Sequence, residues 1–465
     1  MNGDIKIHIS TPFNYKNNVI NIKYNIKTQQ SFPNIIFFSY IIVIHLPRAI
    51  QKIFKAIKRV FLTFLHPVQA IMETIEELIR PHHFLIPALL SLLGTLWIHP
   101  KVLKIAILKN IVDNPDARKL QRNPIPVMGG IAVFFGIIIG ICSSQAIFEC
   151  PDVFMLITAM LIMLYMGTMD DIIDLSPRMR FIIEILLVVW LMYVNSSSIN
   201  NFWGLWGVNT IPLWLAWPLT VFAAVGIINA INLIDGVNGL SSGFCFMAST
   251  LFAIIFYNTG NIKMTILAVS AAGAIVPFFL HNVFGYKTKM FIGDGGTLVI
   301  GIMMSMFVIN ILKDSSECTK FVENGMGLIP MTLAILAIPI FDTLRVMSSR
   351  IMRGTSPFYP DKTHLHHMFI DLGFSHLGTT VSILSINFIV VATWFISYKL
   401  GASVDLQLYI VLAISISATF LFYAFAKRQL ENNGKCLKLL QWIAKAMHYE
   451  KKGIWIKVQK LVDKL

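Results

Sequence analysis

Charged residues are scarce in this chain of 465 residues: Asp, Glu, Lys and Arg make up 13% of it, whereas 56% is hydrophobic. A soluble domain carries roughly a quarter charged residues, so this composition argues against an ordinary water-soluble protein. Cysteine is also rare, with five residues and no Cys-x-x-Cys pair. This absence argues against the cysteine-based zinc and redox motifs. The deficit of charge is concentrated in long apolar runs, which are separated by short polar loops.

Eleven apolar runs follow one another along the chain. A membrane-spanning helix needs about 20 mainly apolar residues, and in lipid all backbone N–H and C=O groups must be bonded within the protein. The alternating strands of about ten residues that mark a transmembrane barrel are absent from the sequence. We therefore expect an all-α, polytopic transmembrane helical bundle of about eleven spans with cytoplasmic catalytic loops. The expected spans are residues 84–100, 126–145, 152–168, 181–195, 211–228, 239–257, 262–280, 297–312, 326–341, 378–398 and 405–425.

The formal net charge of +14 could indicate nucleic-acid binding, but its distribution favours a membrane partner. When alternate loops are assigned to opposite sides, one side holds 24 Lys and Arg residues, ten of them after residue 425, and the other holds four. Such a bias marks the richer side as cytoplasmic. The basic residues are thus explained by topology and by attraction to anionic lipid, and no nucleic-acid partner is expected.

The two ends of the chain differ from the regular pattern of the domain at residues 81–425. Residues 1–80 are a basic extension, which is either an amphipathic surface segment or the result of a start site that truly lies downstream, for instance at Met72. Residues 426–465 are basic and amphipathic. We expect this tail to lie on the cytoplasmic membrane surface, and it shows no catalytic group.

Three carboxylates fall within five residues of the segment GTMDDIIDLSPRMR, at the cytoplasmic end of the third run: Asp170, Asp171 and Asp174. On a continuing helix, Asp170 and Asp174 share a face. Like charges this close repel unless a cation or a shared proton intervenes. Mg²⁺ takes oxygen ligands, usually one or two carboxylates with phosphate oxygens. The segment is a candidate cation site, and the alternative is a solvated helix end beside Arg178 and Arg180.

Two further cytoplasmic turns combine polar residues with glycine. NAINLIDGVNGLSSG contains Asn232 and Asp235, whose side chains could bond a sugar, a ribose or a base edge; the alternative is an ordinary turn with Asn caps. MFIGDGGTLVIG places Asp294 in a Gly-rich turn that enters a helix, a setting in which it would hold a cation. Phe291 precedes it by three residues and could offer its ring to a base.

The longest cytoplasmic loop and the first one complete the set of polar motifs. DKTHLHH contains His364, His366 and His367, which could donate to phosphate oxygens. A zinc site is the alternative, although the usual helical i, i+4 pair and a nearby Cys are missing. The first loop carries Arg122 before the segment PIPVMGG, and its basic residues suit a diphosphate or a lipid phosphate as well as topology alone.

In this order, PIPVMGG, GTMDDIID, NAINLIDGVNGL, FIGDGGT and DKTHLHH resemble the bacterial polyprenyl-phosphate N-acetylhexosamine-1-phosphate transferases over residues 84–425. The HLHH form is most similar to the N-acetylglucosamine-1-phosphate branch. The resemblance implies that Asp294 is a Mg²⁺ ligand and that Asp170 and Asp171 bind metal or activate the lipid phosphate. It also implies substrate-binding roles, with Phe291 stacking on uracil, for these residues: Asn232, Asp235, Phe291, His364, His366, His367 and Arg122.

The resemblance further implies a Mg²⁺-dependent reaction, with Mn²⁺ as a substitute. Sugar-1-phosphate, expected to be N-acetylglucosamine-1-phosphate, passes from a UDP-sugar to undecaprenyl phosphate, releasing UMP and starting the synthesis of a cell-surface glycan such as O-antigen. The enzyme would lie in the bacterial cytoplasmic (inner) membrane with its site on the cytoplasmic face, and related transferases suggest a homodimer. Direct attack and a covalent aspartyl intermediate both stay open.

Two alternatives are retained. The first keeps the chemistry but uses another donor, such as UDP-N-acetylgalactosamine or UDP-N-acetylmuramoyl-pentapeptide. The second is an ion-coupled membrane transporter, which would place carboxylates near the middles of spans, often within inverted repeats. The acidic residues instead fall at the cytoplasmic ends of the runs, and the sequence shows no repeat.

Overall fold

The computed structural model describes residues 84–115, 123–147, 150–357, 361–448 and 453–465. The predicted extension at residues 1–80 and the candidate site residue Arg122 lie outside these ranges. Residues His82–Leu465 form one compact unit, separate from Met1–Pro81. Everything below concerns this unit.

The described residues are mostly helical, as expected for apolar runs that must satisfy their own backbone hydrogen bonds. The helices that form the body of the unit are α3 (Leu85–Leu108), α4 (Gly129–Cys142), α5 (Pro151–Ile173), α6 (Pro177–Asn195), α7 (Leu213–Leu233), α8 (Leu240–Thr259), α9 (Ile262–Phe284), α10 (Gly293–Leu312), α12 (Leu328–Ile335), α13 (Ala337–Met352), α15 (His376–Lys399), α16 (Val404–Ile416) and α17 (Phe422–Glu431). The shorter helices are α11 (Thr319–Glu323), α14 (Leu365–Asp371), α18 (Leu437–Ala446) and α19 (Gly453–Val462).

Few other elements occur in the described part. A π-helical turn, η4 (Ser417–Leu421), continues α16 into α17, and the 3₁₀ turns η2 (Gln145–Ile147) and η3 (Leu205–Gly207) lie in loops. Strands β1 (Val112–Asp113) and β2 (Ile125–Pro126) form a two-stranded antiparallel ribbon in the first loop.

The prediction of an all-α, multi-pass membrane protein is confirmed. Among the described residues, eight helices are long and apolar enough to span a membrane, or nine if the bent pair α12 and α13 forms one span. That pair is bent by 77° where a single straight run was expected over residues 326–341. The apolar helix α4 is shorter than a span, and α6 carries three charged residues. The exact number of eleven spans stays a prediction.

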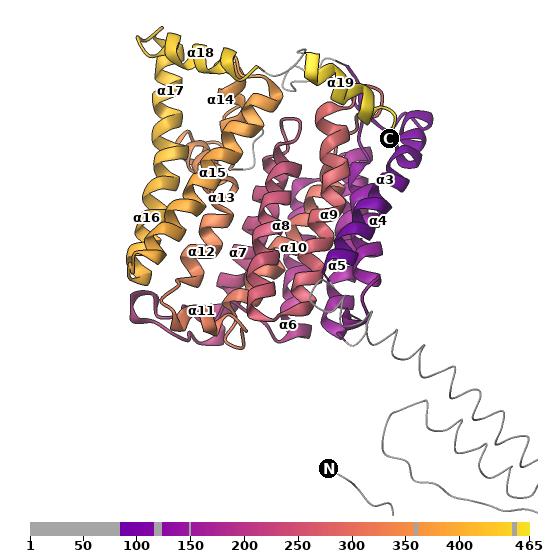
Figure 1. The fold of residues 1–465 in the computed structure, drawn as a ribbon. Helices are drawn as coiled ribbons and strands as arrows, with labels where there is room; N and C mark the ends of the chain where they lie inside the picture. The colour runs from indigo at the N-terminus through magenta and orange to yellow at the C-terminus, as the bar shows by residue number, and fades with distance from the viewer. Residues whose placement is uncertain (1–83, 116–122, 148–149, 358–360, 449–452) are drawn as a thin grey trace, which may run out of the picture. The chain divides into compact units, whose positions relative to one another are not determined.

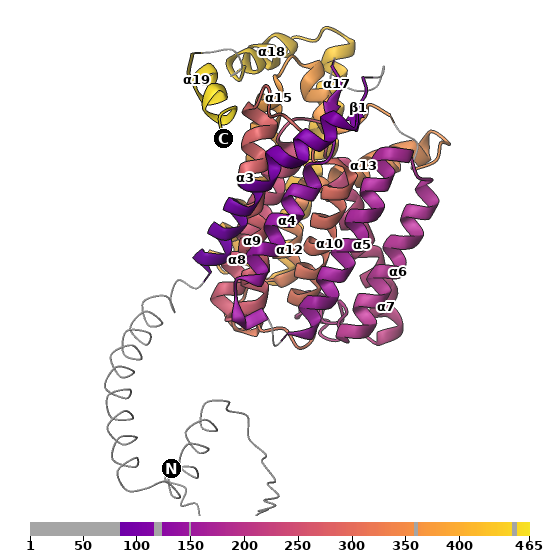
Figure 2. The ribbon, with the colours of Figure 1, turned by 90° about the vertical axis from the view of Figure 1, so that its right-hand side faces the viewer.

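Helix α10 is the centre of the packing, with α5, α7 and α4 against it (Figure 1; Figure 2). Every residue of α10 is buried except Asp294, in its first turn. The glycines of the polar motifs allow this close packing: a Cβ on Gly167 of α5 would lie 2.4 Å from the backbone nitrogen of Gly295. The side chain of Asp294 is therefore held at the end of the most enclosed helix of the bundle.

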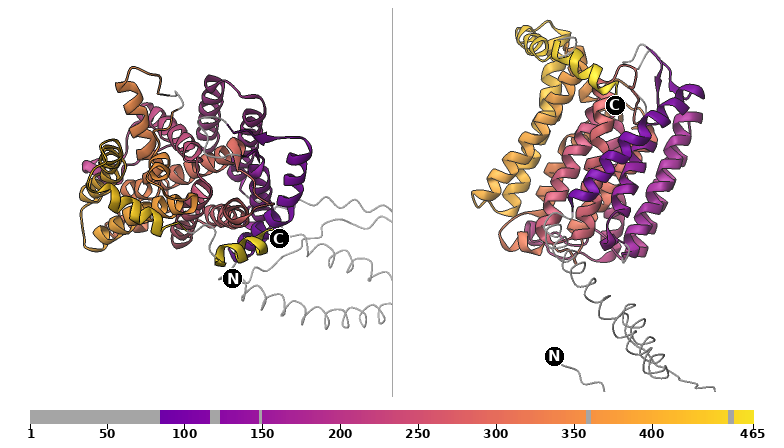
Figure 3. Two further views of the ribbon diagram at one scale, coloured as in Figure 1. Left: turned by 90° about the horizontal axis from the view of Figure 1, so that it is seen from above. Right: turned by 45° about the vertical axis from the view of Figure 1, so that its right-hand side comes forward.

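The later helices form a second group. Helix α15 packs on α12, α16 and α8, and α13 packs on α7 and α15. Seen from above, this orange and yellow group lies to one side of the indigo and magenta helices (Figure 3). A separate hydrophobic cluster, which includes Leu365, Phe369 and Phe374, joins α14 to this group. The histidine motif therefore rests on elements far in sequence from the aspartate motifs.

Candidate functional site

Three helix ends place two of the predicted carboxylates next to one arginine side chain. Asp170 lies in the last turn of α5, Asp294 in the first turn of α10, and Arg180 in the first turn of α6. One guanidinium nitrogen, Nη1 of Arg180, lies 3.0 Å from Oδ2 of Asp170 and 2.8 Å from Oδ2 of Asp294. The other oxygen of Asp170 accepts from the backbone N–H of Leu175 at 2.7 Å. Two carboxylates that would repel each other thus share a positive charge.

Asp171 has a different position from its neighbour. Its carboxylate accepts hydrogen bonds from the backbone N–H groups of Asp294 at 3.1 Å and of Gly295 at 3.5 Å. It therefore caps the N-terminus of α10, where the first N–H groups of a helix have no partner within the helix. The two predicted motifs GTMDDIID and FIGDGGT are joined directly by this cap.

Asp174 does not share the face of Asp170, which corrects the geometry expected from a continuing helix. Helix α5 ends at Ile173, and Asp174 adopts a left-handed backbone with φ of 53°. Its side chain is exposed. A short polar residue tolerates this conformation, which commonly ends a helix. Only two of the three carboxylates in this segment therefore belong to the constellation.

Sequence reasoning missed two charged residues of the site, Arg180 and Glu184. Both lie on α6, where Nε of Arg180 is 3.7 Å from Oε1 of Glu184. Glu184 is completely buried and its other oxygen accepts from the side chain of Asn229 on α7. A buried carboxylate is costly unless paired, and a lone Glu inside an apolar helix was the available signal for it. From the sequence, Arg180 is interpreted only as a basic residue at a cytoplasmic helix end.

Asn232, at the end of α7, joins the second motif to the carboxylates. Its side-chain nitrogen donates to Oδ1 of Asp294 at 2.9 Å and lies 2.8 Å from the hydroxyl oxygen of Thr297. Asp235 follows in the turn between α7 and α8, where it accepts from the hydroxyl of Ser241. Asp235 is exposed, so its remaining lone pairs are accessible to a ligand.

The histidine motif meets the same turn through a glycine. A Cβ on Gly236 would lie 2.1 Å from Nε2 of His366, so the imidazole rests directly on the backbone of the turn. His366 is buried, and its ring lies 5.7 Å from that of His364 and 4.3 Å from that of His367. The spatial order of the motifs therefore runs from the aspartates through the Asn-Asp turn to the histidines.

Hydrogen bonds and ion pairs hold the histidine motif in place. His364 Nδ1 is 3.0 Å from Oδ2 of Asp342 on α13, and Arg345 lies 2.7 Å from the other oxygen of Asp342. Arg350 and Arg353 both pair with Asp361. Burial acts to raise the pKa of Asp361, but the hydrogen bonds, first that of Arg350, hold that pKa below its usual value.

The imidazoles of His366 and His367 are held neutral. Burial, followed by the charge of His367, keeps the pKa of His366 well below 6.5. Burial, followed by the charges of His364 and Lys362, lowers the pKa of His367 to about 4. A neutral imidazole has one N–H donor and one acceptor nitrogen, so these rings can hydrogen-bond a phosphate or a sugar hydroxyl without adding charge.

Phe291 is placed by the first motif. Its backbone N–H donates to the carbonyl of Pro126 at 2.8 Å, and its carbonyl accepts from Gly129 N–H at 2.9 Å. Asn282, at the end of α9, donates to the carbonyl of Met290 at 2.9 Å and accepts from Gly239 N–H at 2.7 Å. The loop that carries Phe291 and leads to Asp294 is thus tied to both PIPVMGG and NAINLIDGVNGL.

All five motifs therefore gather at one end of the bundle, and Arg122, two residues before PIPVMGG, lies outside the described residues. Within the described ranges no three His, Cys, Asp or Glu side chains already stand at the spacing of a metal site. The oxygen donors do fit a cation that takes few protein ligands: Asp170 and Asp294 point to one position, which the Arg180 guanidinium reaches. Mg²⁺ usually binds through one or two carboxylates plus phosphate oxygens. The histidines form no such set with them.

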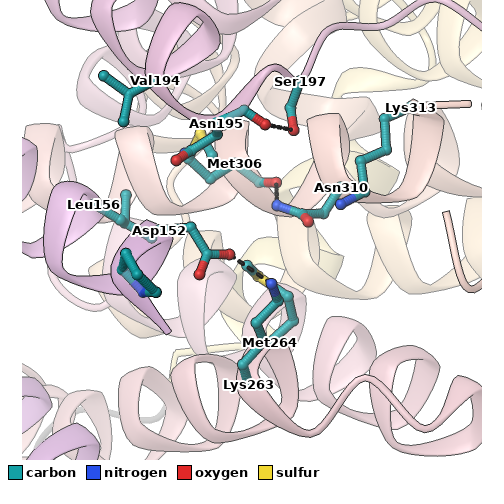
Figure 4. A pocket seen from close by; sticks show the side chains of 11 residues that line it. Asp152, Leu156, Val194, Asn195, Ser197, Lys263, Met264, Met306, Asn310 and Lys313 are labelled. Atoms are coloured by element: carbon teal, nitrogen blue, oxygen red, sulfur yellow. Dashed lines mark hydrogen bonds and ion pairs between the residues drawn. The ribbon is translucent and has the colours of Figure 1, made fainter. Parts of the chain in front are cut away.

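A cavity of about 350 Å³ lies at the opposite end of the bundle, among the ends of α5, α6, α9 and α10 (Figure 4). Asp152 and Lys263 form an ion pair of 2.6 Å in its wall. None of the predicted site residues lines it. The polar motifs and this cavity are therefore separate features of the fold.

Comparison with known proteins identifies the same family that the motifs resemble. The family model described as "Glycosyl transferase family 4" matches residues 153–312. The chain is 32% identical over 322 residues, 68% of its length and 84% of the relative, to a Bacillus subtilis protein named "Probable undecaprenyl-phosphate N-acetylglucosaminyl 1-phosphate transferase". It is 30% identical over 278 residues to an "Undecaprenyl-phosphate alpha-N-acetylglucosaminyl 1-phosphate transferase" of Yersinia pestis, covering 58% of this chain and 73% of the relative. A protein of Escherichia coli K12 with that name is 30% identical over 280 residues, 58% of this chain and 72% of its own.

Proposed function

The chain belongs to the polyprenyl-phosphate N-acetylhexosamine-1-phosphate transferase family, and on that premise we propose that it transfers N-acetylglucosamine-1-phosphate from UDP-N-acetylglucosamine to undecaprenyl phosphate. The observation that carries the proposal is the convergence of Asp170, Arg180 and Asn232 on Asp294 at the end of the buried helix α10. Such a constellation suits a diphosphate, because it offers both a carboxylate pair for a cation and a fixed basic group.

The donor diphosphate would bind beside the carboxylates and Arg180. Asp294 and Asp170 would hold Mg²⁺, or Mn²⁺ in its place, and Asp171 would keep the first turn of α10 aligned so that Asp294 faces the ligand. The bound metal would neutralise charge on the diphosphate during transfer. Arg180 would then donate to phosphate oxygens, since guanidinium groups match phosphate geometry.

The rest of the donor would extend over neighbouring motifs. Phe291 would stack on uracil, and Asn232 and Asp235 would bond the nucleotide sugar. The rings of His364, His366 and His367 would hydrogen-bond the sugar phosphate. Arg122 would add a basic contact to the nucleotide. The continuity of these motifs, from Asn232 through Gly236 to His366, supports one extended binding site for a nucleotide sugar.

Transfer would proceed by attack of a lipid phosphate oxygen on the β-phosphorus. The bond between that phosphorus and the bridging oxygen breaks, the oxygen leaves with UMP, and a sugar–diphosphate–lipid forms. We propose direct attack, in which Asp170 and Asp171 act by positioning and charge and not as nucleophiles. The residues would act by positioning and charge stabilisation, as in phosphoryl transfer generally.

The site would face the cytoplasm of a bacterium from its inner membrane, and the product would start a cell-surface glycan such as O-antigen. The concentration of Lys and Arg on the side of the motifs supports this orientation. The gathering of the carboxylates at helix ends, rather than along the middle of the bundle, disfavours ion-coupled transport.

A transfer assay with matched carboxylate variants tests the proposal. Purified protein is given radiolabelled UDP-N-acetylglucosamine, undecaprenyl phosphate and Mg²⁺, and label in the lipid phase is compared for wild type, Asp294→Asn and Asp174→Asn. Each variant removes one negative charge from a helix end, but only Asp294 contacts Arg180 and Asn232. We expect Asp294→Asn to lose at least about a hundredfold in kcat, and Asp174→Asn to keep wild-type activity.

The outcome also separates the alternatives. Transfer that occurs only from UDP-N-acetylgalactosamine or UDP-N-acetylmuramoyl-pentapeptide would keep the mechanism and change the sugar. A folded wild type that is inert with every donor, or that is as active with EDTA as with Mg²⁺, would contradict the proposal. In the first of these cases ion transport in vesicles is the next measurement.

A further inference from the structure

The loop between α9 and α10, residues 285–292, carries the candidate uracil-stacking residue into the site. On its inner side, the loop is held at Thr288. The carbonyl of Thr288 lies 3.0 Å from Nε2 of His99, and its hydroxyl lies 2.9 Å from Nδ1 of His281. The two imidazole rings stack at 4.2 Å. Three residues after Thr288 comes Phe291, and Asp294 follows it. The position of Thr288 therefore sets the path of the loop into the site.

The C-terminal tail holds the same loop from the other side. Asp463 follows α19, and one of its carboxylate oxygens accepts from the backbone N–H groups of Tyr286 at 2.9 Å, Lys287 at 3.1 Å and Thr288 at 3.3 Å. The same oxygen lies 3.0 Å from the hydroxyl of Thr288. Three successive N–H groups that point at one oxygen form a concave anion-binding arrangement of backbone, here filled by a side chain from the far end of the sequence.

The hydrogen positions follow from the acceptors. A carboxylate can only accept, so the Thr288 hydroxyl donates to Asp463. The hydroxyl has a single hydrogen, and His281 Nδ1 must therefore be the donor to Thr288. The Thr288 carbonyl likewise requires His99 Nε2 to donate. Asp463, Thr288 and the two histidines thus form one network with consistent donors and acceptors.

Helix α19 is seated against the bundle so that Asp463 can reach the loop. It packs against α9, and the ring of Trp455 lies 4.8 Å from that of Phe284, the last residue of α9 (Figure 1). Val462, next to Asp463, is the buried residue of the helix. Burial acts to raise the pKa of Asp463, but the hydrogen bonds, first that of Tyr286, lower it below its usual value, so the carboxylate is charged when it binds the loop.

We infer that Asp463 is a positioning residue, which fixes the loop 285–292 so that Phe291 faces the nucleotide; this inference rests on the proposed function. The carboxylate touches neither Phe291 nor Asp294. It acts through Tyr286–Thr288, while Asn282 and Pro126 hold the loop further on, at Met290 and Phe291. The tail, which shows no catalytic group by sequence, thereby contributes to donor binding.

Steady-state kinetics with three variants test the inference. Asp463→Ala removes the acceptor, and Asp463→Asn keeps one side-chain oxygen in the same place. Glu431→Ala removes an exposed carboxylate that pairs with Lys427 in the same C-terminal part of the chain. We expect Asp463→Ala to raise KM for UDP-N-acetylglucosamine about fivefold to tenfold, with kcat changed less than about twofold. Asp463→Asn should recover part of the loss, and Glu431→Ala should match wild type.

Hydrogen exchange gives a second readout that does not depend on activity. Peptides covering residues 285–292 should exchange faster in Asp463→Ala than in wild type and Glu431→Ala, because three amides lose their acceptor. An unchanged KM with unchanged exchange overturns the inference. So does a fall in folded protein and kcat at constant KM, because Asp463 would then only stabilise the fold. If wild type itself fails to transfer, the proposed function fails, and the exchange experiment still decides whether Asp463 holds the loop.

Discussion

Replacing Gly236 by Ala tests whether the Asn-Asp turn and the histidine motif form a single site. Gly236 is not among the glycines with positive φ, so its backbone conformation suits Ala. The added Cβ would lie 2.1 Å from Nε2, 2.6 Å from Cε1 and 2.8 Å from Cδ2 of His366. Real Cβ atoms essentially never have contacts shorter than 3.0 Å, so the imidazole must leave its place on the turn.

The size of the effect follows from the surroundings of His366. His366 is 3% exposed as a residue, and its ring is flanked by those of His364 and His367, so it has little free space to enter. Overpacking of a filled interior costs about 1–3 kcal/mol, and we expect the lower end because only one side chain must move. The transfer rate should fall by about a hundredfold, because a misplacement of about 1 Å in a positioned group can lower a rate that much.

The assay compares Gly236→Ala with Gly226→Ala in α7, where an added Cβ meets nothing within 4 Å. Thermal unfolding in detergent should show a modest loss for Gly236→Ala and none for Gly226→Ala, because Ala favours a helix interior over Gly. Transfer from UDP-N-acetylglucosamine should fall only in Gly236→Ala. Full activity of a folded Gly236→Ala protein would refute the reasoning, because the contact between the turn and His366 would then be irrelevant to catalysis.

Two further predictions concern charge. Arg180→Ala should lower kcat about a hundredfold, with Arg180→Lys recovering part, because Asp170 and Asp294 lose their shared cation and the diphosphate loses a donor; steady-state transfer rates check this. The pKa of His367 is about 4 in the folded protein, against 6.5 in the unfolded chain. Between these pH values the unfolded chain binds more protons than the folded one. The free energy of unfolding therefore falls as the pH is lowered through that range, by at most about 1.4 kcal/mol per pH unit. Thermal unfolding at about pH 7 and pH 5 should show this loss, and His367→Gln should reduce it.

Much of the site could be predicted because its residue types are unusual in a membrane. Apolar runs must be helical in lipid, and polar groups near them are costly, so Asp170, Asp294 and the three histidines stood out against the composition. The bias of Lys and Arg then assigned their loops to one side. The structure brings the motifs of these loops together at one end of the bundle, and their chemical roles stay predictions.

Arg180 and Asp174 show where local reasoning failed. Arg180 looked like one more basic residue at a helix end, since nothing in its neighbours in sequence reveals a contact with Asp294, 114 positions away. Asp174 looked equivalent to Asp170 as long as the helix was taken to continue. The helix ends at Ile173, and the left-handed residue that follows turns this carboxylate away.

By itself, the amino-acid sequence determined the class of the fold and the set of groups able to do chemistry, because hydropathy and residue type act locally. The tertiary structure alone decided which groups meet. The cap of α10 by Asp171, the contact of His366 with Gly236 and the hold of Asp463 on Tyr286–Thr288 each join distant parts of the chain. Such contacts depend on how whole helices pack, and close packing through glycine brings their ends within hydrogen-bonding distance.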